Sequence, residues 1–341
     1  MNGLAGVLAA AVLALGGQGA APEELWRAGR REEALEAWWR EQERAPGDRA
    51  RLLRIVEAEL AVHRYAAALE HARGLGPEGT RVRGTALYRL GRPAEALGEL
   101  GRGSAAELAM RVDALEMLQR FEEADRELAE LARVTEGQSA SVEAMLGRSA
   151  VRRGDTAAGE RHFRRALELD PVEPGALHGL GLLLRSGDRR PEGLALLKRH
   201  REVTPLLDQL EFAQRGVDLG PTHAANHAAV GDAQRALGRV DAALEAYRTA
   251  DRLASGDALV PVALRHARLL AEDRKDVASA VRVLESAFER CQSAKLLVRA
   301  GDVLAESGDK SGARERWTRA LVLRPQDAEI RARLEAAGGK Q

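Results

Sequence analysis

The chain is poor in the residue types that favour β-sheet. Only 3% of its 341 residues are aromatic, and isoleucine occurs only at Ile55 and Ile330. β-Strands are enriched in aromatic and β-branched residues, so this scarcity argues against a sheet. Alanine, leucine, arginine and glutamate dominate instead. With 45% hydrophobic and 30% charged residues, the composition indicates an ordered protein built from packed helices.

Net charge and cysteine are also lacking. Lys plus Arg and Asp plus Glu both number 52, which gives a formal net charge of +0. No global field therefore attracts nucleic acid or an acidic membrane surface. The single cysteine, Cys291, excludes an internal disulfide framework. We interpret it as an inert side chain near a helix start, because thiol reactivity depends on a special electrostatic environment.

The apolar run Leu4–Leu15 is too short to span a bilayer, which takes about 20 residues. The run and the small residues Gly17 and Gly19 after it are typical of a secretory signal peptide, although no lysine or arginine precedes it. We expect residues 1–19 to be a signal peptide and the mature protein to be periplasmic or secreted, without a membrane span. The alternative is a cytoplasmic protein in which this segment is an apolar helix covering the end of the fold.

What the sequence does contain is an internal repeat. Gly147 recurs as Gly181 and Phe163 as Leu197, both at an offset of 34 residues. Each unit has a glycine in a first helix, a turn, and a second helix with small, bulky, small and proline positions. This second-helix pattern returns at Ala34, Trp38, Pro46; Ala96, Leu100; Ala124, Leu128, Leu131; Gly159, Phe163, Ala166, Pro171; Ala243, Tyr247, Ala250; and Ala313, Trp317, Ala320, Pro325.

The small and special residues of the pattern have three expected roles. Glycines in the first helix let the two helices of a unit approach closely, at Gly147, Gly181, Gly231 and Gly301. Turn glycines end the first helix in a left-handed conformation, at Gly154, Gly238 and Gly308. Prolines stop the second helix, at Pro171, Pro205 and Pro325.

The pattern resembles the tetratricopeptide repeat, whose unit is ~34 residues of helix, turn and helix. The resemblance extends from Pro22 to Asp327. It is strongest at Ser141–Pro171 and Ala294–Pro325, and looser at Tyr65–Gly76, where His63 replaces the turn glycine.

The resemblance implies an all-α fold, a right-handed superhelical α-solenoid of about eight or nine stacked units, some of them degenerate. Neither helix of a unit buries its apolar stripe alone, so neighbouring units stack into one core. The solenoid is expected to span residues 22–326, with irregularities near 204–221, where a unit lacks a helix, and near 251–262. We expect residues 327–337 to form a polar-faced capping helix.

Motifs for catalysis are weak. Gly74–Gly79 fits G-x-G-x-x-G, but it contains a proline and follows no predicted strand, so we interpret it as a loop between units. His223 and His227 have zinc-ligand spacing and Asp232 follows, yet His227 falls at a bulky core position of a unit. We therefore expect no enzyme activity, catalytic residue, cofactor or bound metal. A metal-dependent protein using the two histidines is the least favoured alternative.

In the family that the chain resembles, first helices line a concave groove that binds extended peptides. Carried over to this sequence, the partner-binding positions are Arg81, Tyr88, Arg89, Arg148, Arg152, His178, Arg185, Asp232 and Arg235. The arginine guanidinium suits bidentate contacts with carboxylates, so the expected ligand is an acidic segment or a chain terminus. The alternative is that these charges are an ordinary solvated face.

One known mode of tetratricopeptide binding is excluded. The clamp that holds chaperone C-termini needs asparagines in several units, whereas this chain has only Asn2 and Asn226. Trp38 fits a core position, and Trp39 is expected to pack on the next helix or to mark a contact surface.

The expected function is a non-catalytic protein–protein interaction scaffold that binds an extended or acidic segment of another protein or peptide, in bacterial envelope assembly. Alternatives are a cytoplasmic or membrane-associated regulatory adaptor, and a mainly architectural part of an envelope assembly.

Overall fold

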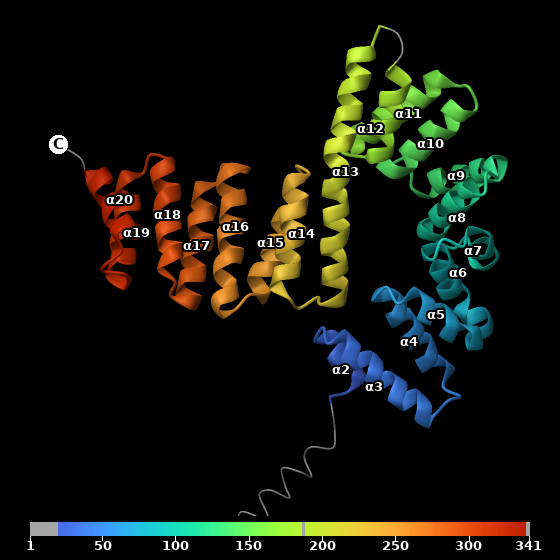
Figure 1. Cartoon of the computed structure of the whole chain (residues 1–341), viewed down its shortest axis with the longest axis horizontal. Helices are drawn as coiled ribbons and strands as arrows, with labels where there is room; N and C mark the ends of the chain where they lie inside the picture. The colour runs from blue at the N-terminus through green and yellow to red at the C-terminus, as the bar shows by residue number, and fades with distance from the viewer. Residues whose placement is uncertain (1–19, 186–187, 339–341) are drawn as a thin grey trace, which may run out of the picture. The chain divides into compact units, whose positions relative to one another are not determined.

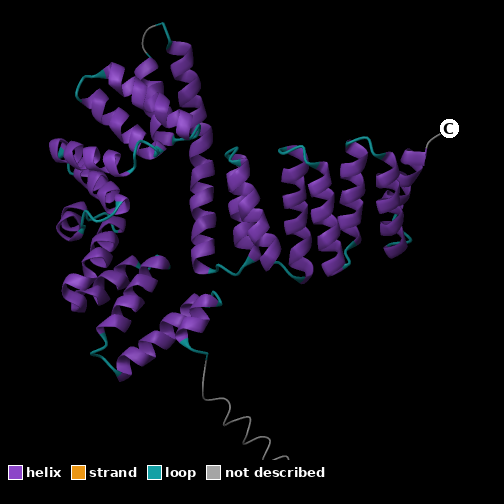
Figure 2. Cartoon of the chain, turned by 180° about the vertical axis from the view of Figure 1, so that it is seen from behind, coloured by secondary structure: helices purple, strands orange, loops and turns teal. Residues whose placement is uncertain are grey.

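The computed structural model describes residues 20–185 and 188–338 (Figure 1). Within these residues the chain forms α-helices and two short 3-10 helices joined by short loops, and no strand is present (Figure 2). The predicted α-solenoid of paired helices is therefore confirmed. The predicted signal peptide, residues 1–19, lies outside the described residues. No helix in the described ranges is both long and apolar enough to cross a membrane.

The chain divides into two compact units, which meet in sequence between Val203 and Thr204. The helices of the first unit are α2 (Pro22–Arg27), α3 (Arg31–Arg44), α4 (Arg49–Ala61), α5 (Tyr65–His71), the 3-10 helix η1 (Ala72–Gly79), α6 (Thr80–Arg89), α7 (Pro93–Glu99), α8 (Ala105–Met117), α9 (Phe121–Val134), α10 (Ala140–Arg152), α11 (Thr156–Leu169), α12 (Pro174–Leu184) and the beginning of α13 (Arg190–Leu219).

The second unit holds the end of α13 and the helices α14 (Ala224–Ala236), α15 (Val240–Leu253), η2 (Gly256–Ala258), α16 (Leu259–Glu272), α17 (Val277–Cys291), α18 (Ala294–Glu306), α19 (Lys310–Leu323) and α20 (Ala328–Gly338). α20 covers the stretch for which the sequence predicts a capping helix. It packs against α19, and its Ile330 joins the buried core that contains Trp317.

Close helix packing inside each pair depends on the predicted glycines. A Cβ atom at Gly147 of α10 would lie 2.6 Å from the Phe163 ring of α11, closer than real Cβ contacts. The same relation joins a glycine to a bulky residue one helix later in three more pairs, Gly181 with Leu197, Gly231 with Tyr247 and Gly301 with Trp317. The glycine therefore gives space to the side chain that fills the core of its own pair.

The turns between the helices of a pair are left-handed, as predicted. The backbone φ angle is 87° at Gly154 and 76° at Gly238. Where the pattern lacks glycine, His63 and Gln119 adopt the same conformation, with φ angles of 61° and 59°. A non-glycine residue with positive φ is uncommon, so the pair geometry dominates over the local preference of these two side chains.

The prediction that Pro205 ends a helix is wrong. Pro205 lies inside α13, which is 30 residues long and continues to Leu219. The proline ring removes one backbone hydrogen bond of the helix. Apolar residues on both sides, Val203, Leu206 and Leu207, are buried or half-buried. We attribute the continuity of α13 to this packing, which offsets the lost bond.

The first helices of successive pairs contact one another. In the first unit α4 contacts α6 and α6 contacts α8, while α10 contacts α12. In the second unit α14 contacts α16, and α16 contacts α18. First helices thus form a shared face in each unit, and we call this face the first-helix surface.

Candidate partner-binding surface

The residues predicted to bind a partner lie on or at the ends of first helices. Arg81, Tyr88 and Arg89 belong to α6, Arg148 and Arg152 to α10, and His178 to α12, where Arg185 is the C-cap residue. All of these are in the first unit. Asp232 and Arg235 lie on α14 of the second unit.

Arg148 and Arg152 form one cluster with carboxylates of the preceding pair. A guanidinium nitrogen of Arg148 lies 3.0 Å from Glu116 of α8, and one of Arg152 lies 3.3 Å from the same carboxylate. Arg152 also lies 2.5 Å from Asp125 of α9, which accepts a hydrogen bond of 2.6 Å from the Ser149 hydroxyl.

The Arg152 guanidinium further stacks over the Phe121 ring, 4.4 Å from its centroid. Arg152 is therefore held on two sides, and only 24% of its side chain is exposed, against 41% for Arg148. Since arginine has five N–H donors, Arg148 keeps donors for a further carboxylate.

α6 shows a second set of contacts between neighbouring first helices. Arg81 forms an ion pair with Glu57 of α4, and the Tyr88 hydroxyl donates a hydrogen bond of 3.0 Å to Asp113 of α8. Burial, together with the Asp113 carboxylate, raises the pKa of Tyr88 to about 12. Burial also raises the pKa of Asp113. The Arg89 guanidinium lies 6.0 Å from the Tyr88 ring centroid and is exposed.

α12 carries a histidine contact in place of an ion pair. The ring of His178 lies 5.1 Å from that of His200 on α13. Burial and the neighbouring His178 lower the pKa of His200. Arg185 is exposed.

In the second unit, Asp232 and Arg235 of α14 also face the next first helix. Arg235 lies 2.8 Å from Glu272 and 2.6 Å from Asp273, at the end of α16. Asp232 accepts a hydrogen bond of 2.6 Å from the Tyr247 hydroxyl and pairs with Arg265 of α16 at 3.3 Å. Burial and the bond to Asp232 raise the pKa of Tyr247.

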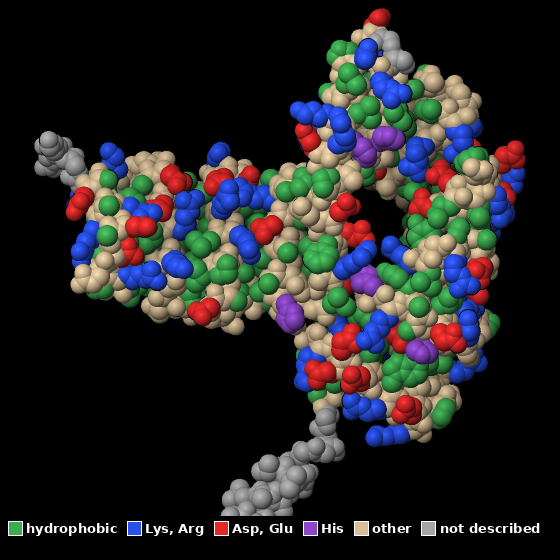
Figure 3. Space-filling view, in the orientation of Figure 1, with side chains coloured by type: hydrophobic (Ala, Val, Ile, Leu, Met, Phe, Trp, Pro, Cys, Tyr) green, Lys and Arg blue, Asp and Glu red, His purple; other side chains and the backbone are tan. Residues whose placement is uncertain are grey.

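The structure thus adds the carboxylate partners that the sequence interpretation missed. Glu116 and Arg148 are 32 residues apart and Arg235 and Glu272 are 37 apart, close to one repeat. An acidic and a basic residue separated by about one repeat, both on first helices, are the sequence signal by which such partners can be found. Figure 3 shows basic and acidic side chains interleaved on the visible face of the molecule.

Trp26 is a further aromatic of a first helix that the sequence interpretation did not select. It lies on α2, its ring centroid 5.5 Å from that of Trp38 and 3.9 Å from the Arg31 guanidinium. Trp39 contacts the following pair, since its indole nitrogen lies 3.3 Å from Glu59 and its ring packs edge-on against His71. Of its two expected roles, packing on the next helix is therefore the one seen.

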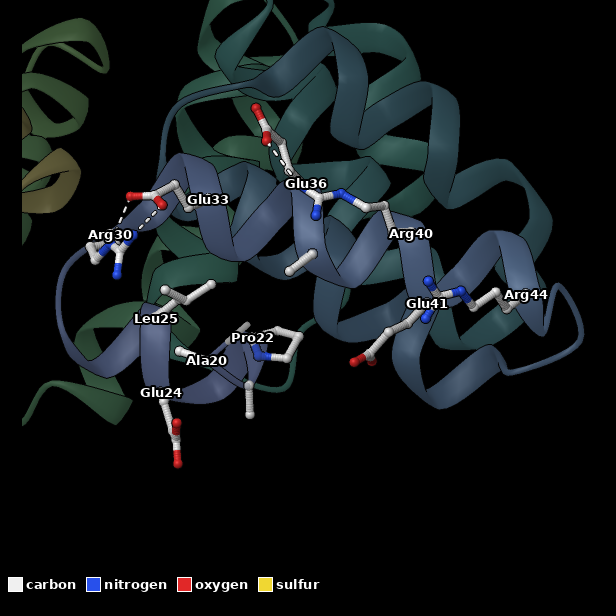
Figure 4. Close-up of a pocket in the computed structure, with 12 residues that line it drawn as sticks. Ala20, Pro22, Glu24, Leu25, Arg30, Glu33, Glu36, Arg40, Glu41 and Arg44 are labelled. Atoms are coloured by element: carbon white, nitrogen blue, oxygen red, sulfur yellow. Dashed lines mark hydrogen bonds and ion pairs between the residues drawn. The ribbon is translucent and has the colours of Figure 1, made fainter. Parts of the chain in front are cut away.

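A hollow of about 810 Å³ lies at the first helix pair and is lined by α2 and α3 (Figure 4). Four of its charged side chains pair with one another along α3. Arg30 donates to Glu33 at 2.7 Å, and Arg40 lies 3.3 Å from Glu36. We interpret this hollow as a solvated helix face rather than as a ligand site.

The histidines considered for a metal site are used differently. A ring nitrogen of His227 lies 2.7 Å from the Pro221 carbonyl oxygen, and His223 is exposed at the start of α14. Over residues 20–185 and 188–338, no group of three or more histidine, cysteine or acidic side chains is arranged to hold a metal ion. Cys291 is half-buried against the core of the second unit.

Comparison with known proteins agrees with this architecture. A tetratricopeptide repeat family model matches residues 57–109 and 144–205. The predicted tetratricopeptide repeats are therefore confirmed in these stretches. Proteins built from such repeats generally act as non-catalytic scaffolds for protein–protein interaction. A search of curated proteins gives no match.

Solved structures similar to the chain include three bacterial proteins. A thermophilic TPR protein of Thermus thermophilus is 20% identical, with 58% of this chain and 98% of that chain covered and a TM-score of 0.32. The C-terminal part of a TPR repeat-containing protein from Cytophaga hutchinsonii is 14% identical, with coverage of 74% and 98% and a TM-score of 0.30. A tetratricopeptide repeat protein from Parabacteroides merdae is 13% identical, with coverage of 77% and 99% and a TM-score of 0.30.

Proposed function

We propose that the protein is a non-catalytic scaffold that binds an acidic, extended segment of another protein along the first-helix surface of the first unit. The observation that carries this proposal is the cluster of Arg148 and Arg152. Both arginines already hold carboxylates, those of Glu116 and Asp125, in the way that an acidic ligand would be held.

A partner carboxylate does not have to displace Glu116 or Asp125. The Arg148 side chain is 41% exposed and keeps N–H donors for a further carboxylate, while Arg152 and its two acidic partners hold the cluster in place. Arg89 and Arg185 add two exposed guanidinium groups, and neither forms an ion pair with a carboxylate of the described residues. Affinity then comes from several repeats in succession, each contributing a small amount.

The test measures binding of a short, labelled Asp/Glu-rich peptide to the full chain at low salt. We expect the double variant Arg148→Gln with Arg152→Gln to bind about tenfold more weakly, which corresponds to about 1.4 kcal/mol. The matched control is Arg120→Gln with Arg133→Gln, because these arginines pair with Glu123 and Glu130 on the second helix α9.

Equal loss of affinity in both double variants would reduce the effect to net charge and overturn the proposal. Equal affinity of the Arg148/Arg152 variant and the wild type would do the same. Circular dichroism melts of each variant establish that the helices are retained.

The proposal includes a place in the bacterial envelope, to which residues 1–19 would direct the protein as a signal peptide. It is supported by the apolar run Leu4–Leu15 and the small residues that follow. Mass spectrometry of the protein from fractionated cells tests it. We expect the envelope fraction to hold a chain that lacks residues 1–19, and an intact chain in the cytoplasm would contradict the proposal.

A further inference from the structure

The end of α13 is a second helix without a first helix of its own. Residues 204–219 finish as other second helices do, with a small residue followed by a proline five positions later. Gly216 and Pro221 match Ala166 and Pro171 in this spacing. The segment lies against the following first helix, because the Asn226 side-chain amide donates to the carbonyl oxygens of Gly216 and Gly220, at 2.5 and 3.0 Å.

Every later pair of the second unit has a first helix that packs on its second helix, as α14 packs on α15 and α18 on α19. For residues 204–219 the second unit provides no such helix. Phe212 is left with 80% of its side chain exposed. The other tyrosine, phenylalanine and tryptophan rings of this unit, those of Tyr247, Phe288 and Trp317, are buried, so an exposed Phe212 needs an explanation.

Phe212 borders a hollow of about 460 Å³ that lies entirely within the second unit. Phe212 and Ala213 line it from α13, and Ala229 and Ala233 line it from α14. Ala213 and Ala233 are buried, so the floor is made of methyl groups. We call this hollow the Phe212 groove.

The walls of the Phe212 groove select the secondary structure of a ligand. Both walls are faces of α-helices, whose backbone N–H and C=O groups are used within the helices themselves. A ligand finds no backbone partner on either wall. A helix satisfies its own backbone groups, so it can cover the apolar floor of the groove without leaving a backbone N–H or C=O group unpaired.

The charge of the Phe212 groove selects the ligand further. Asp208 and Asp232 line it, and none of the described lining residues is basic. Asp208 is exposed and forms no ion pair or hydrogen bond with the described residues, and it lies one helical turn from Phe212. Asp232 is about half exposed despite its bonds to Tyr247 and Arg265.

We propose that the Phe212 groove binds an amphipathic helix of a partner protein, in the place that a first helix takes in the other pairs. The apolar face of that helix covers Phe212 and the alanine floor, and lysine or arginine side chains on its flank pair with Asp208 and Asp232. This site goes beyond the scaffold function proposed above. It is centred on a different unit and takes a ligand of opposite charge, although Asp232 was predicted as part of the partner-binding surface.

Two other occupants fit the groove less well. Residues 1–19 contain no lysine or arginine to meet the two carboxylates. A second copy of the chain would give self-association, which the experiment below detects directly.

The probe is a fluorescent amphipathic helical peptide of leucine, alanine and lysine, with leucine at positions i, i+3, i+4 and i+7. Anisotropy titrations use the full chain at low salt, and a peptide with glutamate in place of lysine is the charge control. We expect Phe212→Ala to weaken binding of the lysine peptide about tenfold, as loss of a central aromatic anchor does. Asp208→Asn should weaken binding severalfold and flatten its salt dependence.

Val322→Ala is the matched control variant, because Val322 is another exposed apolar side chain of the same unit, 74% exposed and outside the groove. It should bind like the wild type. Hydrogen exchange should show that the lysine peptide protects residues 204–236, and that the Asp/Glu-rich peptide used for the first unit does not. Circular dichroism confirms that each variant is folded.

Five outcomes would overturn the inference. Unchanged affinity of Phe212→Ala, or equal binding of the glutamate peptide, would show that the lysine peptide binds elsewhere. A dimer of the wild type that Phe212→Ala dissociates would assign the groove to a second copy. An increase in affinity after deletion of residues 1–19 would assign it to that segment. If the wild type does not bind the lysine peptide but binds the acidic peptide, this inference is overturned and the scaffold proposal stands. The two proposals therefore fail separately.

Discussion

The aromatic ring of Phe163 lies against the backbone of Gly147, with 2.6 Å left between the ring and the position that a Cβ atom would take. The ring comes from α11 and the glycine from α10, so this contact closes one helix pair. Phe163 is only 1% exposed.

Gly147→Ala should destabilise the first unit by about 1–3 kcal/mol, because the new methyl group displaces a packed ring. The measurement is the midpoint of urea unfolding followed by circular dichroism. The matched control is Gly98→Ala in α7, where a Cβ atom would meet nothing within 4 Å. Since alanine is the better helix former by ~1 kcal/mol, Gly98→Ala should be neutral or stabilising. A neutral Gly147→Ala would contradict the account of close packing.

Glu127 of α9 accepts hydrogen bonds from Arg111 at 2.8 Å and Arg102 at 2.6 Å. The side chains of Glu127 and Arg111 are only 8% and 11% exposed. Glu127→Gln leaves the buried Arg111 without a counter-charge, and we expect destabilisation of about 3 kcal/mol. Glu123→Gln on the same helix breaks only the exposed pair with Arg120 and should leave the unfolding midpoint unchanged. Similar midpoints for the two variants would show that burial of the Glu127 pair is unimportant.

The pKa of Tyr88, raised to about 12 by burial and by Asp113, gives an alkaline pH dependence. An unfolded tyrosine titrates near 10. The folded-state pKa is the higher one, so the stabilisation is fully present below about pH 10 and is lost as the pH rises toward about 12.

Asp113→Asn should lower the pKa of Tyr88, because it removes the carboxylate that opposes the phenolate. An ultraviolet titration of phenolate formation measures this, and the Tyr88→Phe variant identifies which signal belongs to Tyr88. The proposed effect of Asp113 is wrong if the Tyr88 phenolate forms at the same pH in Asp113→Asn as in the wild type.

Pro205 interrupts the hydrogen bonding of α13 without ending the helix. Pro205→Ala restores the N–H group, and it should stabilise the middle of α13 by about 1–3 kcal/mol. Native-state hydrogen exchange should slow for amides near residue 205. Pro261→Ala is the control, because Pro261 lies in the first turn of α16, where the N–H has no partner inside the helix. Unchanged exchange around residue 205 would indicate that the helix is already relaxed there.

The sequence predicted the helix pairs because their determinants are local. Each close contact joins a glycine to a bulky residue 16 positions later, as Gly147 is joined to Phe163, so it can be predicted from a short stretch of sequence. Pro205 was misinterpreted for the complementary reason. The rule that proline ends a helix considers the backbone alone, whereas the buried Val203 and its neighbours favour a continuous helix.

The candidate surface was only partly predictable. The sequence placed Arg148 and Arg152 on a first helix. Their partners Glu116 and Asp125 belong to the preceding helix pair, so the contacts depend on how successive pairs stack and cannot be predicted from one repeat alone. The exposure of Phe212 also follows from stacking. The sequence indicated a unit with a missing helix, but not which side chain that absence leaves uncovered.

Contacts between helices that are close in sequence also determine how this chain folds. The main contacts of the described helices join elements that are adjacent in sequence or one helix apart. Such a low contact order predicts folding in microseconds to milliseconds for a helical module. Because each pair stacks on its neighbours in sequence, the N-terminal repeats can acquire structure while the C-terminal ones are still being synthesised.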